Sequence, residues 1–400
     1  MISVEEARGR ILANITPVGA ETVALAQGLG RVLAAPVVAR LNQPPADVSA
    51  MDGYALRAVD AAPGARLRLI GEAPAGRPFG GVVGPREAVR VFTGSVIPEG
   101  ADAVIIQEDV DLDTGFVSPR DGAVPGRHIR PRAQDFAQGT ELLGRGERLT
   151  ARGLGLAAAA NTPWLSVHRR PRVAILCTGD EISLPGEPLM AGGIVNSNAA
   201  LLSAFVAAQG GEPLVLPMAR DDISAIAQGA DAARGADLLV TSGGASVGTH
   251  DLIQTGLAER GFALDFWKIA MRPGKPLIFG RVGTLPVLGL PGNPVSAYVC
   301  ALLFLAPLLA ALAGQGAAAG LPVLEPAPLG APLKANDQRE DFLRARLVAS
   351  ELGEVVVPYD YQDSSQLRAL AGAEALICRK PFAPAAGPGA LVQIIRLRNT

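Results

Sequence analysis

Short apolar runs alternate with helical patterns between Arg172 and about Gly314. RVAILCT (172–178) and ADLLVTS (236–242) are mostly apolar and lead into glycines, which is typical of buried parallel strands. Between them, NSNAALLSAFVAAQGG (196–211) has apolar residues at helical spacing and stops at glycine. We therefore expect an α/β domain, residues 171–315, in which helices cover both faces of a parallel sheet.

The third run of this domain, TLPVLGL (284–290), leads into a long apolar segment. Asn293 is placed to cap the helix that follows, and Pro294 can occupy its first position. Residues 297–314 carry no charge over 18 residues, which is the lower length limit for a membrane-spanning helix. Pro307 interrupts this stretch and no basic flank supports insertion, so we expect a buried helix and no membrane span.

The chain on either side of this domain follows other patterns. Residues 43–139 are rich in Gly, Pro and Val, with alternating runs such as ARLRLIG and EAVRVFTG, and this predicts a β-rich inserted domain. Residues 1–42 and 140–170 look helical and are expected to form a linking domain around the insertion. After a Pro/Gly/Ala linker, a strand-rich tail predicts a C-terminal β domain, residues 316–400.

Length and composition narrow the class of protein. A chain of 400 residues exceeds one ordinary core, which agrees with several domains. With 18% charged residues and a formal net charge of −2, the chain has no broad surface for nucleic acid or an anionic membrane. Cys177, Cys300 and Cys378 have no metal-ligand spacing, and the N-terminal pattern is not that of a signal peptide, so we expect a cytoplasmic protein.

Three loops of the α/β domain combine glycine with polar residues: TGDE (178–181), SGGASVG (242–248) and LPGNPVS (290–296). Such loops share the carboxyl edge of an open parallel sheet, where ligands bind. Their N–H groups and the adjoining helix N-termini suit a phosphate, although a single loop is equally well explained as a tight turn. Neither a P-loop nor a dinucleotide fingerprint is present. The candidate ligand-binding residues are Gly243, Gly244, Ser246, Gly248, Pro291, Asn293, Pro294 and Ser296.

Charged residues near these loops suit a phosphate ligand and a metal. A helix would place Lys268 and Arg272 on one face, and an extended loop would also bring them together with Lys275. Mg²⁺ takes one or two carboxylates with water and substrate phosphate. The acids available for it are Asp180, Glu181, Asp221, Asp222 and Asp251. The alternatives are a solvated basic loop for the cations and helix caps or surface positions for the acids.

Seven motifs in register resemble the molybdopterin molybdenumtransferases, the family of the MoeA proteins and the gephyrin E domain. They are AMDGYA (50–55), AGRPFGG (75–81), VFTGSVIPEGADAVIIQED (91–109), TGDEI (178–182), TSGGASVG (241–248), MRPGKP (271–276) and GLPGNPVSA (289–297). The resemblance implies an elongated homodimer of four-domain subunits, whose α/β domain binds molybdopterin. It implies an enzyme that inserts molybdenum from molybdate into adenylylated molybdopterin, releases AMP and requires Mg²⁺.

The resemblance also implies roles for individual residues. Functional positions of the family match Asp52, Thr93, Asp135, Glu181, Asp221, Asp251, Lys268, Arg272 and Lys275. Asp221 and Asp251 are expected to hold the metal, directly or through water, and Glu181 to join them or to position substrate. In the family dimer, AMDGYA faces the α/β domain of the other subunit, which implies a shared active site. Transient contacts with a molybdopterin adenylyltransferase or with acceptor molybdoenzymes are also expected.

The chain departs from the family pattern at a few positions. Ala133 and Gln134 stand where Gly and Glu are usual, Asn196 replaces a common acid, and Arg272 replaces a common lysine. Two other functions share parts of the pattern. A molybdopterin adenylyltransferase has the α/β domain but lacks the AMDGYA and FTG region, and a molybdopterin-binding scaffold would resemble gephyrin, whose E domain also binds receptor tails.

Overall fold

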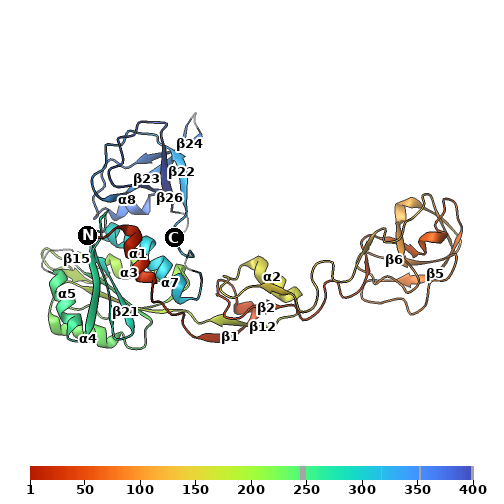
Figure 1. The fold of residues 1–400 in the computed structure, drawn as a ribbon, viewed down its shortest axis with the longest axis horizontal. Coiled ribbons are helices and arrows are strands. Elements are labelled where there is room, and N and C mark those ends of the chain that lie inside the picture. The colour runs from red at the N-terminus through yellow and green to blue at the C-terminus, as the bar shows by residue number, and fades with distance from the viewer. Residues whose placement is uncertain (244–248, 317, 351–352, 398–400) are drawn as a thin grey trace. The chain divides into compact units, whose positions relative to one another are not determined.

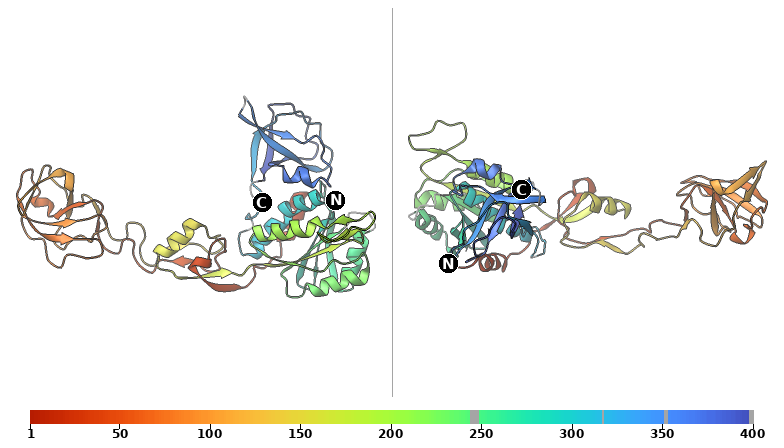
Figure 2. Two further views of the ribbon diagram at one scale, coloured as in Figure 1. Left: turned by 180° about the vertical axis from the view of Figure 1, so that it is seen from behind. Right: turned by 90° about the horizontal axis from the view of Figure 1, so that it is seen from above.

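The computed structural model describes residues 1–243, 249–316, 318–350 and 353–397, apart from the side chains of residues 249–251. The chain forms two compact units. Unit 1 consists of residues 1–21, 30–34 and 167–400, and unit 2 of residues 22–29 and 35–166. The green and blue ribbons in Figures 1 and 2 belong to unit 1.

Unit 1 contains a six-stranded sheet in the order β16-β13-β17-β21-β20-β18. These strands are β13 (Arg172–Thr178), β16 (Glu212–Val215), β17 (Leu238–Gly243), β18 (Phe262–Lys268), β20 (Pro276–Val282) and β21 (Leu285–Pro291). The first four in the sheet order are parallel to one another. The apolar runs of β13, β17 and β21 predict three of these strands, and β16 is an additional one. β20 runs antiparallel to both of its neighbours, β21 and β18. The two-residue turn at Gly283 returns the chain from β20 directly to β21 without a crossover helix, which explains the reversed direction of β20.

Helices cover both faces of this sheet, as predicted. On one face, α4 (Ile223–Ala232) and α5 (Thr249–Ala258) belong to the apolar cluster of Ala174, Leu176 and Leu239. On the other, α1 (Val4–Leu12) and α3 (Ser197–Ala208) pack with Val173, Ile175 and Val240. Sheet residues alternate between the two clusters because successive strand side chains point to opposite faces.

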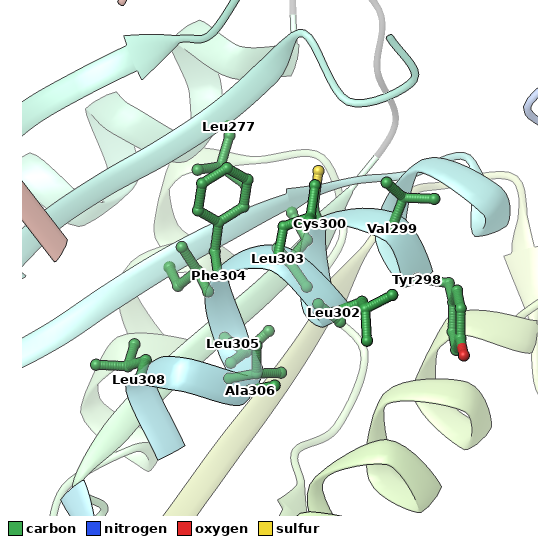
Figure 3. Packing of buried hydrophobic residues seen from close by; sticks show 14 of the residues in the cluster. Leu277, Tyr298, Val299, Cys300, Leu302, Leu303, Phe304, Leu305, Ala306 and Leu308 are labelled. Atoms are coloured by element: carbon green, nitrogen blue, oxygen red, sulfur yellow. The ribbon is translucent and has the colours of Figure 1, made fainter. Parts of the chain in front are cut away.

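The long apolar segment forms one helix, Pro294–Leu312, which is long and apolar enough to cross a membrane. It consists of α6 (Pro294–Cys300), the π-helical η4 (Ala301–Leu305) and α7 (Ala306–Leu312). Within its 18-residue window, 94% is buried inside the protein, and Figure 3 shows its side chains in the apolar cluster that includes Leu277. The structure therefore places it as a core helix, in agreement with the sequence interpretation.

The C-terminal residues form a second sheet of unit 1, in the order β19-β23-β25-β26-β22 with β24 paired to β23. Its elements are β22 (Leu324–Pro328), β23 (Glu340–Ser350), β24 (Gly353–Pro358), α8 (Leu367–Ala371), β25 (Ala375–Arg379) and β26 (Leu391–Arg396). The edge strand β19 (Met271–Arg272) comes from the α/β region and runs parallel to β23. The tail thus shares a sheet with the α/β region, and both lie together in Figure 1.

Unit 2 is rich in short strands over residues 43–139, as predicted. Its main sheet has the order β7-β4-β6-β5-β9-β8, and β10 pairs with β3. The elements are β3 (Val48–Ser49), β4 (Gly53–Leu56), η2 (Ala58–Asp60), β5 (Leu67–Ala73), β6 (Glu87–Val91), β7 (Ala103–Ile106), η3 (Gln107–Asp109), β8 (Val110–Asp113), β9 (Phe116–Pro119) and β10 (Ile129–Arg130). Two apolar clusters, centred on Leu56 and Val89, fill it.

The flanking arms are less helical than the sequence predicts. Besides α1 they contain β1 (Ala20–Ala24), η1 (Leu25–Gln27), β2 (Val37–Val38), β11 (Glu141–Leu143), α2 (Ala151–Ala159) and β12 (Trp164–His168). β2 pairs with β11, so local helix propensity loses to strand pairing between distant segments. α1 is not part of a linking domain core, because Val4, Ala7 and Ile11 lie in the apolar cluster of the α/β sheet.

Candidate functional site

A cavity of about 320 Å³ lies at the carboxyl ends of β13, β17 and β21. Each of the three predicted ligand loops contributes to it, for example through Glu181, Gly243 and Asn293. Its other lining residues are Cys177, Thr178, Ile182, Ile194, Val195, Asn196, Ser197, Asn198, Ser242, Gly292, Pro294, Ser365 and Leu367. The convergence follows from parallel strands, whose carboxyl ends share one edge of the sheet.

The polar part of the cavity is organised by Asn198 in the first turn of α3. Its Nδ2 donates to Ser242 Oγ at 2.9 Å and to the carbonyl of Gly292 at 2.6 Å, so it connects two loops. Asn198 Oδ1 and Thr178 Oγ1 are buried and have no hydrogen-bond partner among the described residues. A buried polar atom without a partner is costly, so these two oxygens suit a ligand that brings N–H or O–H donors.

Sequence reasoning missed Asn198 and Thr178. Both lie in segments that it did quote: Thr178 is the first residue of the loop TGDE, and Asn198 lies beside Ser197 at the start of the predicted helix. Asn196, which replaces the acid common in the family, is the N-cap of α3 and accepts from the N–H of Ala199 at 3.1 Å. The amide therefore performs the capping task without a charge.

One wall of the cavity is apolar. It comes from a two-stranded ribbon in which β14 (Ile182–Ser183) pairs with β15 (Ile194–Val195). Cys177 is also part of the lining, and burial raises the pKa of its thiol, although a hydrogen bond with Asn196 works against this shift. The thiol is therefore neutral and unsuited as a nucleophile. A lining that combines apolar side chains with amide and hydroxyl groups suits a flat, polar-edged heterocycle.

Three acids lie near one another, Asp180, Glu181 and Asp221, and we call them the rim acids because one of them, Glu181, lines the cavity. The N–H of Asp221 donates to Asp180 Oδ1 at 3.3 Å, and Glu181 lines the cavity. Burial raises the pKa of Asp221, and the negative charges of Glu181 and Asp180 raise it further. The capping alternative for Asp221 is wrong, because Asp222 is the N-cap of α4 and accepts from the N–H of Ala225 at 2.8 Å.

The structure fits only part of the expected metal site. Among the described residues, no three or more His, Cys, Asp or Glu side chains are arranged to hold a metal ion. Asp251 lies in the first turn of α5, but its side chain is outside the description, as are Gly244, Ser246 and Gly248. The rim acids match an ion such as Mg²⁺, which needs one or two carboxylates and takes its other ligands from water and phosphate.

Of the residues expected in the loop after β21, Asn293 and Pro294 line the cavity, whereas Pro291 and Ser296 are not among its lining residues. The carbonyl of Pro291 accepts from Ser242 Oγ at 3.3 Å, and Ser296 is buried within α6. Asn293 occupies the N-cap position as predicted, but its side chain does not cap the helix. Instead, Asn293 Nδ2 donates to Ser364 Oγ at 2.8 Å.

The three expected cations lie on extended backbone, so the helical alternative for Lys268 and Arg272 is wrong. β18 ends at Lys268, Arg272 belongs to β19 and Lys275 precedes β20, because Pro273 is incompatible with a continuing helix. The ammonium of Lys268 lies 3.5 Å from the centroid of the Trp267 ring. None of the three belongs to the cavity lining that the described residues form.

Arg272 is already engaged by carboxylates. Its Nε donates to Asp341 Oδ1 at 2.9 Å, a second bond joins the same two groups, and Nη1 lies 3.4 Å from Asp337 Oδ2. The Asp341 hydrogen bond is the main cause that raises the pKa of Arg272. The guanidinium thus holds β19 to the C-terminal sheet, a structural task that the sequence did not indicate.

Unit 2 brings Asp52 and Thr93 together. The N–H and the hydroxyl of Thr93 both donate to Asp52 Oδ1, at 2.7 and 2.9 Å. These two bonds, followed by the charge of Arg90, lower the pKa of Asp52. Asp135 is exposed, and its N–H donates to the carbonyl of Gln43 at 2.9 Å. Ala133 has a φ of 61°, a left-handed conformation that explains why glycine is usual in the family at this position.

A larger cavity, about 880 Å³, lies at the opposite edge of the α/β sheet, before β17 and β21. Three of its arginines are paired with acids that line the same cavity: Arg169 with Asp237, and both Arg234 and Arg260 with Asp231. The smaller cavity is the stronger candidate, because it lies at the sheet edge where ligands bind and contains orphaned polar atoms.

Comparison with known proteins extends these observations. The MoeA N-terminal region (domains I and II) matches residues 2–161, the probable molybdopterin-binding domain matches residues 174–311, and the MoeA C-terminal region (domain IV) matches residues 326–397. Molybdopterin molybdenumtransferase 2 of Mycobacterium tuberculosis is 37% identical over 374 residues, or 89% of this chain and 90% of that protein. The chain belongs to the molybdopterin molybdenumtransferase family.

Further relatives agree with this membership. A molybdopterin molybdenumtransferase of Haemophilus influenzae is 36% identical over 318 residues, 79% of this chain and 78% of that protein. The solved structure of a molybdopterin biosynthesis MoeA protein from Pyrococcus horikoshii is similar, with a TM-score of 0.85 and 30% sequence identity. The similarity covers 100% of this chain and 99% of that protein. As a molybdopterin molybdenumtransferase, the chain is a transferase of molybdenum cofactor biosynthesis, and its multidomain α/β fold is confirmed.

Proposed function

We propose that this chain inserts molybdenum from molybdate into adenylylated molybdopterin, releases AMP and requires Mg²⁺. The observation that supports this most directly is the cavity at the carboxyl edge of the sheet, whose α/β lining lies within the match to the molybdopterin-binding domain. The cavity combines an apolar wall, orphaned oxygens and rim carboxylates, which are the groups that a pterin with an attached pyrophosphate requires.

The chain's own residues would bind and orient the substrate. Asn198 Oδ1 and Thr178 Oγ1 accept hydrogen bonds from pterin N–H groups, and Ile182 with its neighbours packs against the ring. The backbone of the glycine-rich loop, from Gly243 onwards, is suited to the phosphate, since glycines allow close approach of N–H groups. These contacts fix the dithiolene end of the substrate relative to the rim.

For the metal, we propose Asp221, Asp251 and Glu181. The pKa of Asp221 is raised mainly by burial and further by the charges of Glu181 and Asp180. A cation would neutralise the charge that these acids share, which supports this choice. When bound, Mg²⁺ supplies charge neutralisation for the pyrophosphate that is cleaved to release AMP. Molybdate is the second substrate, and we propose that Asp52 and Thr93 orient it together with Asp135 and the cations Lys268, Arg272 and Lys275.

We further propose that the active enzyme is a cytoplasmic homodimer, in which Asp52 and Thr93 of one subunit serve the cavity of the other. Family resemblance supports this arrangement. The two hydrogen bonds from Thr93 also support it, because they keep the Asp52 carboxylate ionised and therefore suited to act on a substrate. An equal mixture of the Asp52→Ala and Glu181→Ala variants should recover about a quarter of the wild-type activity. Half of the dimers are then mixed, and each mixed dimer has one intact site and one inactive site. Recovery of no activity would oppose a shared site.

The decisive experiment is turnover by the purified protein. Adenylylated molybdopterin, Mg²⁺ and molybdate should yield AMP and a product that reconstitutes an apo-molybdoenzyme. Omitting molybdate or Mg²⁺ should remove the response. Asp221→Ala and Asp251→Ala should lower the rate at least about 100-fold, whereas Asp222→Asn, which keeps the α4 cap and removes an adjacent charge, should retain it.

The same assay separates the alternatives. Formation of adenylylated molybdopterin from MgATP, without any molybdate-dependent step, would indicate an adenylyltransferase. The matches to the MoeA N- and C-terminal regions oppose that function, because both lie outside the α/β domain. Binding of molybdopterin with no turnover would indicate a scaffold.

A further inference from the structure

Arg90, on β6, lies close to the pair that Asp52 and Thr93 form. It is the cross-strand partner of Tyr54 on β4, two positions after Asp52, and it precedes Thr93 by three positions on its own strand. Its charge is one of the causes that lower the pKa of Asp52. Unit 2 therefore places a cation next to the two residues that are expected to serve molybdate.

Three neighbours hold the guanidinium of Arg90 in one place. Its central carbon lies 4.9 Å from the centroid of the Tyr54 ring and 5.3 Å from that of the Phe92 ring, which is within the range of cation–π attraction. Nη2 donates to Gln107 Oε1 at 2.5 Å, and the N–H of Gln107 donates to the carbonyl of Asp52 at 3.1 Å. The cation is thus fixed by side chains that belong to the motifs AMDGYA and VFTGSVIPEGADAVIIQED.

Most of the hydrogen-bond donors of Arg90 remain free for a ligand. A guanidinium carries several N–H groups in a planar fork. Among the residues that the structure describes, Gln107 is its only hydrogen-bond partner, and no carboxylate forms an ion pair with it. Arg66 of the same unit, in contrast, is paired with Asp113 at 2.8 Å. A fixed, permanently charged fork with free donors suits an oxyanion.

The two neighbours of Arg90 cannot bind an oxyanion by themselves. The N–H and the hydroxyl hydrogen of Thr93 are both given to Asp52 Oδ1, so neither is left for a ligand. Asp52 is ionised and repels a second negative charge. Of these three residues, only Arg90 offers both the charge and the donors that molybdate requires.

We propose that Arg90 is the molybdate-binding residue of unit 2, and that its guanidinium donates hydrogen bonds to molybdate oxygens while Asp52 stays ionised beside it. This deepens the proposed function and rests on it, because it takes the region of Asp52 and Thr93 to serve molybdate. The roles in unit 2 are then divided: Arg90 attracts the oxyanion and offsets the repulsion by Asp52, and Thr93 keeps the Asp52 carboxylate in place.

The test is the rate of AMP release by the full-length protein as a function of molybdate concentration, at saturating adenylylated molybdopterin and Mg²⁺. Arg90→Gln should raise the KM for molybdate about tenfold or more, the effect of losing a charged hydrogen bond. The KM for adenylylated molybdopterin should not change. Arg90→Lys keeps the charge but lacks the planar fork, so its KM for molybdate should lie between those of the wild type and Arg90→Gln.

Arg66→Gln is the matched control for Arg90→Gln. Arg66 also belongs to unit 2 and also lies over a ring, 4.0 Å from the centroid of Phe116, but its side chain is 58% exposed and its guanidinium is paired with Asp113. The substitution therefore removes the same kind of side chain without touching the Asp52 region. Its KM for molybdate should equal that of the wild type.

Chemical rescue gives a second measurement. Arg90→Ala leaves a space between the rings of Tyr54 and Phe92 in which a small guanidinium ion can lie. Millimolar ethylguanidinium should therefore lower the raised KM of this variant for molybdate, and it should have no effect on Arg66→Ala. Should Arg90→Gln not fold, as its melting temperature would show, Arg90→Lys and the rescue of Arg90→Ala still decide the question.

The outcomes separate this inference from the proposed function. If the wild type responds to molybdate and the Arg90 variants have an unchanged KM for it, the proposal for Arg90 is overturned and the proposed function stands. An unchanged KM together with a shifted pH profile of kcat overturns it as well, because Arg90 then acts only through the ionisation of Asp52. If the wild type does not respond to molybdate, the proposed function is overturned first, and the role of Arg90 with it.

Discussion

Thr93 donates two hydrogen bonds to a single oxygen of Asp52, one from its N–H at 2.7 Å and one from its hydroxyl at 2.9 Å. Both favour the ionised form of Asp52, and the two sequence motifs AMDGYA and FTG thereby form one polar unit. A carboxylate whose pKa is lowered on folding stabilises the folded state above its unfolded pKa, and this contribution is lost as the pH falls through the folded pKa.

Replacing Thr93 by Val removes the hydroxyl bond and keeps the backbone bond. We expect the pKa of Asp52 to rise part of the way toward its ordinary value, which a carbon-13 NMR titration of the side-chain carboxyl would measure. Thr114→Val is the control, because the side chain of Thr114 has no hydrogen bond with Asp52. An Asp52 pKa that does not move would show that the backbone N–H alone holds the carboxylate.

Asp221 should respond to pH in the opposite sense. Because its pKa is raised in the folded chain, the ionised form destabilises folding above the unfolded pKa, and this penalty vanishes at lower pH. Asp221→Asn should therefore raise the melting temperature at neutral pH and leave it nearly unchanged below about pH 3.5. A pH-independent effect would argue against a charge origin.

The neighbouring acid provides a second measurement on the same group. Glu181→Gln should lower the pKa of Asp221 toward its ordinary value, because Glu181 contributes to the shift. Adding Mg²⁺ should lower it as well if the rim carboxylates bind the ion. A pKa that is insensitive to millimolar Mg²⁺ would oppose the proposed role of Asp221.

Gly243 is required by packing at the end of β17. A Cβ at this position would lie 2.3 Å from Thr178 Oγ1 and 3.1 Å from Ile253 Cδ1. Gly243→Ala should therefore destabilise unit 1 by about 1 to 3 kcal/mol and weaken ligand binding by displacing Thr178. Gly9→Ala, in α1 with open space around its Cα, should instead be neutral or stabilising by up to about 1 kcal/mol. Thermal unfolding of both variants makes the comparison.

Arg272→Ala should destabilise the chain by about 2 to 3 kcal/mol. The substitution leaves the carboxylate of Asp341, which is 5% exposed, without its guanidinium partner. Arg234→Ala removes an arginine whose side chain is 82% exposed and should cost less than about 1 kcal/mol. Equal losses in denaturant unfolding would mean that the Arg272 pair contributes no more than a surface contact.

The strands and helices of the α/β domain were predictable because their signals are local. RVAILCT is β13 residue for residue, and the helix after Asn196 begins where its polar residues indicate. The antiparallel strand β20 was missed, since an apolar run does not reveal the direction of a neighbouring strand. The prediction of mainly helical flanking arms was wrong for a related reason: the pairing of β2 with β11 depends on residues about 100 positions apart.

The candidate site was predictable only as far as its loops. Glu181, Gly243 and Asn293 were indicated by glycine-rich turns after strands, and the structure gathers them at one cavity. Thr178 and Asn198 differ from ordinary core polar residues only in having an oxygen without a partner, a property that needs coordinates. The ion pair between Arg272 and Asp341 was not predictable from the sequence either, because the two residues lie 69 positions apart and no local pattern links them.

The order of the elements along the chain protects its most apolar helix during synthesis. Pro294–Leu312 would expose an aggregation-prone surface if it left the ribosome before its partners. Yet α1, α3 and β21, which contact it, all precede it in the sequence. A nascent chain that has reached Leu312 already possesses much of the surface that shields this helix, so its time as an exposed target for chaperones or misassembly is short.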